Sequence, residues 1–192
     1  MLEQLVQQDI QVLIYLNNLG SETWDGLWQF LTRQTNWVPY FAFLLYLVVR
    51  QFGWRQTAWV VICIALLILV CDQSTNLIKN TVMRLRPCSD PDVAPYIRAV
   101  IQRSSFSFVS GHSSNSMAVT VFLFAILRPY YKNIGLIFFW PLVFAYSRIY
   151  VGVHYPLDIL CGFAWGMVLA TLALLVYRKG RHLPYFTSPE KK

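Results

Sequence analysis

Three short stretches each lie at an end of a long apolar segment and together offer two histidines, a carboxylate and three cations. They are Lys79-(six residues)-Arg86-Pro87, Ser110-Gly111-His112 and Ser147-Arg148-(five residues)-His154-(three residues)-Asp158. Cations bind the oxygens of a phosphate dianion and become more important as charge spreads in the transition state. One histidine can attack phosphorus while the other supplies a proton. The set therefore predicts phosphoryl transfer through a histidine at a membrane surface.

The third stretch is the most specific of the three. Pro156 suits the first turn of a helix, so His154 lies just before that helix and Asp158 near its third position. A carboxylate there can orient one ring nitrogen and leave the other free as a nucleophile. Arg148 precedes His154 by six residues, far enough to fold across a bound phosphate. The alternative is that Asp158 only caps the helix, with Arg148 and His154 as interfacial residues.

The first stretch places two cations seven residues apart. On a continued helix Lys79 and Arg86 would share one face two turns apart, and Pro87 would end that helix. Both side chains would then reach a phosphate at the membrane rim. The alternative is that they extend toward lipid headgroups, which is common for basic residues at helix ends.

The second stretch precedes a predicted helix with three serines in its first turns. Free backbone N–H groups at a helix start bind anions, and Gly111 lets the backbone approach closely. His112 is then a candidate general acid. The alternative is an ordinary capped helix start around Ser110, with an incidental histidine.

Long apolar helices must position these residues. The chain is 56% hydrophobic and 13% charged, whereas soluble domains are about 25% charged. Five segments are apolar enough to be predicted spans: 37–50, 57–78, 113–127, 133–147 and 157–177. Residues 1–36 show weaker helical spacing and predict either a tilted sixth span or a helix in the interface. The prediction is an all-α polytopic membrane bundle of about six helices.

One membrane domain, 1–192, is expected, with an N-terminal segment 1–36, a motif-bearing core 37–178 and a basic tail 179–192. The N-terminus lacks the pattern of a cleavable signal peptide. The 16 Lys and Arg residues are spread over short connections and the tail, which disfavours nucleic acid as a partner. Placing the tail in the cytoplasm puts all three stretches on the opposite face of the membrane.

Three further features have simpler interpretations. Gly162 and Gly166 predict a close contact between helices. Asp72 is a functional candidate because it lies within an apolar segment, although its polar neighbours can also satisfy it. Arg84 is a candidate accessory contact for the phosphate.

The three stretches resemble the motifs of the type 2 phosphatidic acid phosphatase superfamily, which are K-x6-R-P, P-S-G-H and S-R-x5-H-x3-D. This chain reads K-NTVMRL-R-P, V-S-G-H and S-R-IYVGV-H-YPL-D, with Val109 in place of the proline. The resemblance implies a six-helix membrane core and no metal or other cofactor. It implies that His154 is the nucleophile, that Asp158 supports it and that His112 protonates the leaving group. It also implies that the phosphate is held by Lys79, Arg86, Arg148, Ser110 and Gly111.

The expected function is a metal-independent membrane lipid phosphatase that works through a phosphohistidine. Its partners would be the bilayer and a lipid phosphate: undecaprenyl diphosphate, the phosphates of lipid A or phosphatidylglycerol phosphate. The expected location is the bacterial inner membrane, with the active site on the periplasmic face. A lipid-phosphate phosphotransferase and a non-catalytic lipid-phosphate binding or transport protein are the alternatives. A vanadium haloperoxidase is disfavoured by the apolar spans. The sequence leaves the substrate lipid and the oligomeric state open.

Overall fold

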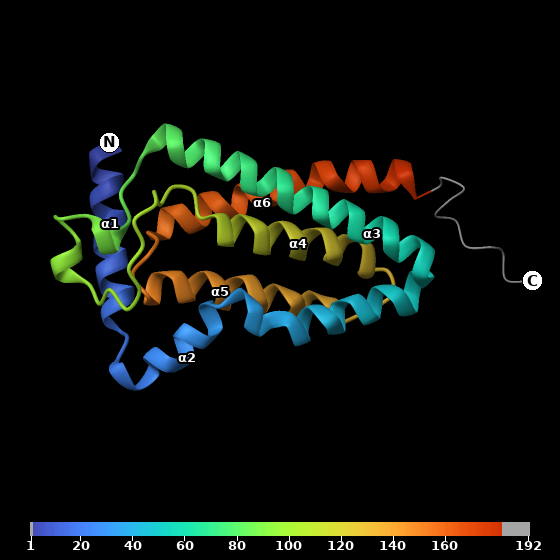
Figure 1. The fold of residues 1–192 in the computed structure, drawn as a ribbon, viewed down its shortest axis with the longest axis horizontal. Helices are drawn as coiled ribbons and strands as arrows, with labels where there is room; N and C mark the ends of the chain where they lie inside the picture. The colour runs from blue at the N-terminus through green and yellow to red at the C-terminus, as the bar shows by residue number, and fades with distance from the viewer. Residues whose placement is uncertain (1, 182–192) are drawn as a thin grey trace, which may run out of the picture.

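Apolar segments of the chain form helices that run side by side along the long axis of the molecule (Figure 1). The structure is a computed structural model that describes residues 2–181. Its α-helices are α1 (Leu2–Asn18), α2 (Glu22–Thr32), α3 (Val38–Val82), α4 (Gly111–Leu127), α5 (Phe139–Tyr150) and α6 (Pro156–Gly180). Short 3-10 helices cover Gln34–Trp37, Pro87–Ser89, Ala94–Tyr96 and Ile134–Phe138. The described residues contain no strand, so the all-α prediction is confirmed.

Helix α3 is a hairpin of two arms joined at Gly53. This glycine has φ 70° and ψ 171°, a conformation that glycine adopts readily because it has no Cβ atom. The two arms run in opposite directions along the bundle (Figure 1). They correspond to the predicted helices 37–50 and 57–78, which meet at the non-helical residue Gly53.

Only α3 and α6 are long and apolar enough to cross a membrane by themselves within the described residues. Helix α4 has 17 residues and the apolar segment Ile134–Tyr150 is of similar length, whereas a span needs about 20. The prediction of five spans is therefore not confirmed, because these two helices fall short of that length. Each of them still lies along the bundle axis (Figure 1).

Helices α4 and α6 make a close contact at the two glycines predicted for that role. A Cβ atom on Gly162 would lie 2.7 Å from the Ser110 carbonyl oxygen, and one on Gly166 would lie 2.3 Å from the Ser114 carbonyl oxygen. No side chain can be accommodated there without a shift of the backbone. The predicted contact is confirmed, and it seats the start of α4 against α6.

Gly166→Ala is expected to lower the free energy of unfolding by about 1–3 kcal/mol, since it overpacks the contact with a backbone atom. The measurement is the Tm of the detergent-solubilised protein. Gly26→Ala is the matched control, because a Cβ atom at Gly26 meets nothing within 4 Å. Equal Tm values for the two variants would show that the α4–α6 contact is not close.

Helix α1 lies across one end of the bundle instead of along it (Figure 1). Asp9, Leu13 and Asn17 recur at every fourth position and form its buried face. The Asn17 side-chain amide donates hydrogen bonds to the carbonyl oxygens of Ile149 (3.0 Å) and Tyr150 (2.8 Å). This orientation favours the interfacial alternative for the N-terminal segment.

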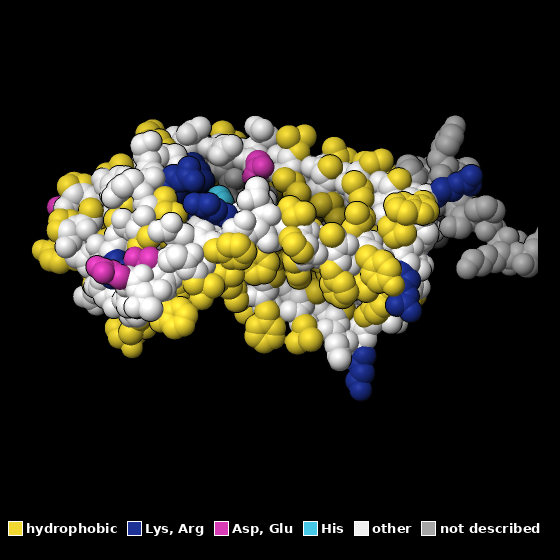
Figure 2. All heavy atoms as spheres, turned by 60° about the horizontal axis from the view of Figure 1, so that its bottom comes forward, with side chains coloured by type: hydrophobic (Ala, Val, Ile, Leu, Met, Phe, Trp, Pro, Cys, Tyr) yellow, Lys and Arg dark blue, Asp and Glu magenta, His cyan; other side chains and the backbone are white. Residues whose placement is uncertain are grey.

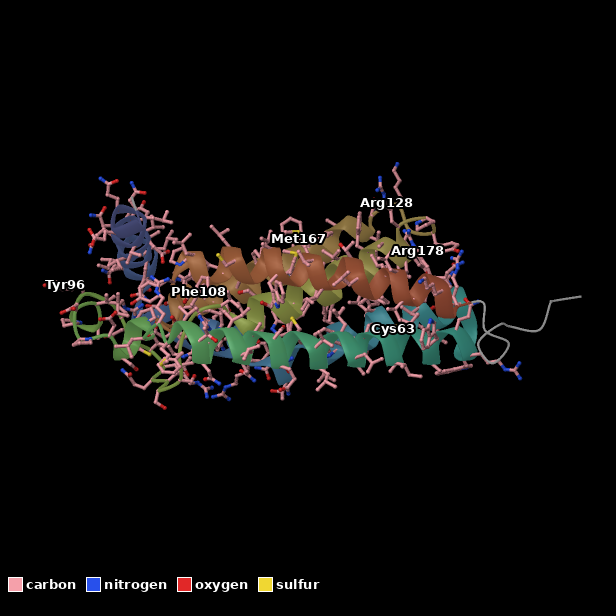
Figure 3. The ribbon with its side chains drawn as sticks, turned by 90° about the horizontal axis from the view of Figure 1, so that it is seen from above. Cys63, Tyr96, Phe108, Arg128, Met167 and Arg178 are labelled. Atoms are coloured by element: carbon pink, nitrogen blue, oxygen red, sulfur yellow. The ribbon has the colours of Figure 1, made fainter. Side chains whose placement is uncertain are left out.

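The basic connections lie at the end of the bundle away from α1. Figure 3 shows Arg128 and Arg178 at that end, while Tyr96 and Phe108 lie at the other. The bend of α3 at Gly53 is at the same end as Arg128 (Figures 1 and 3). Residues 182–192 of the predicted basic tail lie outside the described residues. Arg128 and Arg178 therefore lie at the end of the bundle opposite Tyr96 and Phe108.

Candidate active site

The chain leaves helix α3 before it reaches the second cation of the first motif. Met83 has a left-handed conformation (φ 52°), and its N–H donates to the Lys79 carbonyl oxygen, which ends the helix at Val82. Arg86 is extended (φ −75°, ψ 150°), because Pro87 disfavours helical geometry in the residue before it. The expectation of a helix continued to Pro87 is wrong. Lys79 lies in the last turn of α3, whereas Arg86 lies in the loop.

The guanidinium of Arg86 is held beside a histidine of the third motif. Its Nε atom donates to the Ser105 carbonyl oxygen (2.8 Å), and its Nη1 atom donates to the Val153 carbonyl oxygen (3.0 Å). Nη1 also lies 3.1 Å from Nε2 of His154. A guanidinium can only donate hydrogen bonds, so Nε2 is the acceptor and carries a lone pair.

The other ring nitrogen of His154 faces a buried carboxylate. Its Nδ1 atom lies 3.2 Å from Oδ2 of Asp158, and both side chains are almost fully buried. Since Nε2 accepts a hydrogen bond, Nδ1 carries the proton and donates it to Asp158. The same oxygen accepts the backbone N–H of Tyr155 (3.0 Å) at the start of α6. Asp158 thus caps the helix and orients the histidine, which combines the two interpretations of the sequence.

Burial and positive charge keep His154 neutral. Burial lowers the pKa of His154 well below its ordinary value of 6.5, and the cations of Arg86, Arg148 and Lys79 lower this pKa further. In the unfolded chain the same group takes up a proton near pH 6.5. The folded protein therefore binds fewer protons than the unfolded chain below that pH.

Acidification below pH 6.5 is expected to lower the free energy of unfolding, by up to about 1.4 kcal/mol per pH unit for this one group. The stability is fully present above the unfolded pKa and is lost as the pH falls toward the lowered pKa of folded His154. The measurement is Tm between pH 7.5 and 5.5 for the wild type and for His154→Gln. A slope that is equally steep in the variant would contradict this assignment.

Helix α4 begins where the second motif predicts an anion site. Ser110 is its N-cap and accepts a hydrogen bond from the Ser113 backbone N–H (3.3 Å). Gly111 and His112 follow as the first two residues of the helix, where N–H groups have no partner within the helix. The Ser110 hydroxyl is also engaged by the Ser113 hydroxyl (2.9 Å), so its contact with phosphate stays a prediction.

Lys79 and Arg148 border this helix start. A Cβ atom on Gly111 would lie 3.8 Å from the Lys79 Nζ atom, within ordinary contact distance, so the cation lies beside the start of α4. The Arg148 Nη1 atom donates to the Thr32 hydroxyl (2.6 Å), but its Nε atom is buried without a hydrogen-bond partner among residues 2–181. An unsatisfied buried donor on a cation is costly unless an anion binds to it.

All eight residues predicted for the site converge at the motif-bearing end of the bundle. His112 interacts electrostatically with the second histidine and with each of the three cations. Figure 2 shows basic side chains and a histidine in a hollow at this end, with hydrophobic side chains covering the middle of the molecule. The convergence of the three motifs at one end is therefore a property of the fold.

Arg84 has a different position from the one predicted. Its Nη1 atom donates to Oδ1 of Asp158 (3.0 Å), and its Nη2 atom donates to Oδ2 of Asp9 (2.7 Å). Its guanidinium also stacks on the Tyr155 ring at 3.6 Å. The expectation of an accessory phosphate contact is wrong, because both carboxylates neutralise this cation. Asp9 was missed, although its register with Leu13 on α1 could have indicated a buried carboxylate.

A cavity of about 550 Å³ opens beside the residues predicted to bind phosphate. Lys79, Gly111 and His112 line its polar end. Its remaining walls come from both arms of α3, from α4 and from α5, and they are mostly apolar. The site therefore joins a cationic end to a space that suits hydrocarbon.

The PAP2 superfamily model matches residues 56–181. The chain belongs to the PAP2 superfamily. It is 35% identical to the lipid A 4'-phosphatase of Bacteroides thetaiotaomicron over 84% of this chain and 73% of that protein. It is 28% identical to the lipid A 4'-phosphatase of Porphyromonas gingivalis over 94% of this chain and 77% of that protein. The resemblance inferred from the three motifs is confirmed.

The fold also resembles a solved PAP2 structure. The transmembrane phosphatidylglycerolphosphate phosphatase of Bacillus subtilis superposes with a TM-score of 0.71 at 21% identity, covering 94% of this chain and 89% of that chain. The predicted enzyme class is confirmed, since these PAP2 relatives are phosphatases. The names of both curated relatives give lipid A as the molecule on which they act.

Proposed function

We propose that this PAP2 protein hydrolyses a phosphate ester or diphosphate of a membrane lipid through a phosphohistidine on His154. The observation that carries the proposal is the pair of contacts made by the imidazole. Asp158 receives the Nδ1 proton, while Nε2 presents its lone pair toward Arg86. A phosphate bound by that arginine brings its phosphorus to the nucleophilic nitrogen.

The proposed reaction has two steps. In the first, Nε2 of His154 forms a bond to phosphorus as the bond to the leaving oxygen breaks, and His112 gives that oxygen a proton. Asp158 stabilises the resulting positive charge on the imidazole. In the second, His112 takes a proton from water, the water oxygen bonds to phosphorus and the P–N bond breaks.

Phosphate binding is assigned to three cations and the start of α4. Lys79, Arg86 and Arg148 neutralise the equatorial oxygens, and the N–H of Gly111 and the hydroxyl of Ser110 add hydrogen bonds. The unpartnered Nε atom of Arg148 supports this assignment. The cations supply the charge stabilisation that a divalent metal gives in other phosphatases.

The proposed location is the bacterial inner membrane, with the motif-bearing end on the periplasmic face. The basic residues near the bend of α3 and after α4 support this orientation, because positive charge favours the cytoplasmic side. The names of two relatives support lipid A phosphate as the first candidate lipid. Undecaprenyl diphosphate and phosphatidylglycerol phosphate are the other candidates.

The test is phosphate release by the purified protein in detergent with excess EDTA. Lipid A, undecaprenyl diphosphate, phosphatidylglycerol phosphate and phosphatidic acid are offered separately, with inorganic phosphate as the readout. Release from at least one lipid supports hydrolysis. Phosphate transferred to an added alcohol instead of water would support the phosphotransferase alternative. No release from any lipid would favour a binding or transport protein.

A further inference from the structure

We propose that Asp72 and Asn115 form a subsite for a hydroxyl or amide N–H donor on the leaving group, next to the phosphate. Such a subsite selects phosphorylated sugar or glycerol lipids over lipid diphosphates. The inference rests on the proposed function, because the roles of His154 and His112 locate the leaving group.

The second arm of α3 presents a graded face to the cavity. Lys79, Asn76 and Asp72 follow one another at intervals of three or four residues, and Ile68 and Ile64 continue the series. Residues at this spacing share one face of a helix. The wall therefore changes from a cation to polar groups and then to hydrocarbon.

Helix α4 has the same order on the opposite wall. His112 is followed by Asn115 and then by Val119 and Leu123, again at helical spacing. The Asn115 side-chain amide donates to Oδ1 of Asp72 at 2.7 Å, which links the two polar bands. Both walls thus place polar groups between the phosphate-binding end and the apolar part.

The linked pair offers a hydrogen-bond acceptor that no protein group uses. Oδ1 of Asn115 is buried and has no hydrogen-bond partner among residues 2–181. A buried polar atom without a partner is costly, and both an amide oxygen and a carboxylate accept hydrogen bonds. The acceptor that a ligand in the cavity can reach is the carboxylate of Asp72, an exposed residue of the α3 wall, which Asn115 holds in place by its hydrogen bond to Oδ1.

The leaving group must pass this pair. His112 lines the cavity while His154 does not, and the leaving oxygen departs opposite the attacking nitrogen. Asn115 is three residues beyond His112, or about 4.5 Å along the helix. This matches a hydroxyl on the carbon next to the phosphate ester. In a diphosphate the second phosphate would lie there and meet the carboxylate of Asp72, which repels it.

Two synthetic lipids that differ in one hydroxyl test the subsite directly. They are 1-oleoyl-glycerol-3-phosphate and the same lipid without its 2-hydroxyl. The wild type is expected to favour the first in kcat/KM by about 10-fold or more, the effect of one hydrogen bond to a charged group. Equal values for the two lipids would overturn the inference and leave the proposed function intact. No hydrolysis of either, by protein that releases phosphate from another membrane lipid, would overturn the inference alone. No release from any lipid would overturn both.

Variants of Asp72 test whether this residue causes the preference for the lipid with the 2-hydroxyl. Asp72→Leu is expected to reduce the ratio for the two lipids to near unity. Asp72→Asn is expected to raise kcat/KM for farnesyl diphosphate relative to the 2-deoxy lipid, because it removes the repelling charge. The control is Asp92→Asn, the same change on an exposed loop residue that does not line the cavity. An unchanged ratio in Asp72→Leu would contradict the proposal.

Discussion

His154→Ala is expected to reduce phosphate release by about 10⁴-fold or more and to abolish the phosphoenzyme. Removal of a nucleophile that acts together with its general acid leaves only the catalysis from binding and charge. Here the cations and the start of α4 would remain, so substrate affinity should change little. The measurement is trapping of ³²P-labelled protein with an alkaline denaturing quench, in which phosphohistidine is stable, together with steady-state phosphate release.

His112→Ala is the matched comparison for this variant. It removes the proton donor and keeps the nucleophile, so a substrate with a good leaving group, such as p-nitrophenyl phosphate, should still form the phosphoenzyme. Hydrolysis of an unactivated lipid phosphate should fall, because its leaving oxygen needs the proton. Near-normal turnover by His154→Ala would reject the phosphohistidine mechanism.

Arg84→Ala is expected to cost about 3–5 kcal/mol in the free energy of unfolding, since it leaves two buried carboxylates without their cation. The side chains of Asp9 and Asp158 are 1% and 0% exposed. Without Arg84, Asp158 keeps the Tyr155 N–H on Oδ2 but loses its partner on Oδ1, so we expect the carboxylate and the imidazole to shift. A misplacement of about 1 Å costs about 10²-fold in rate. Tm and kcat measure the two effects.

Arg98→Ala is the control, because it breaks the ion pair with Asp25, in which both side chains are nearly a quarter exposed. That pair lies nearer the surface and contributes less. If Arg84 only stabilised the fold, its variant would retain the wild-type pH profile of kcat at a temperature where it is folded. A shifted profile would show that Arg84 acts on the His154–Asp158 pair.

Local rules were sufficient to predict part of the site. Pro156 and Asp158 lie within one helical turn of His154, so their geometry depends on one helix start. The contact at Gly162 and Gly166 follows from small residues at helical spacing in an apolar segment. In both cases the residues that make the feature are close neighbours in sequence, so helical geometry alone places them together.

Other features depended on packing between distant segments. The ion pair of Arg84 with Asp9 joins residues 75 apart in sequence, and it needs α1 to lie across the bundle. The end of α3 was also not predictable, because Met83 is not a glycine and yet adopts a left-handed conformation. At Gly53 the structure has the two helices that the sequence indicated, but the sequence did not indicate that a single non-helical residue joins them.

The hydrogen bond between Arg86 and Nε2 of His154 also bears on the end of the catalytic cycle. Incoming phosphate has to displace this bond, and the bond re-forms when free phosphate departs. Nε2 of His154 thus competes with the product phosphate for Arg86. Inorganic phosphate is consequently expected to be a weak product inhibitor. The enzyme–phosphate complex should therefore not accumulate during turnover.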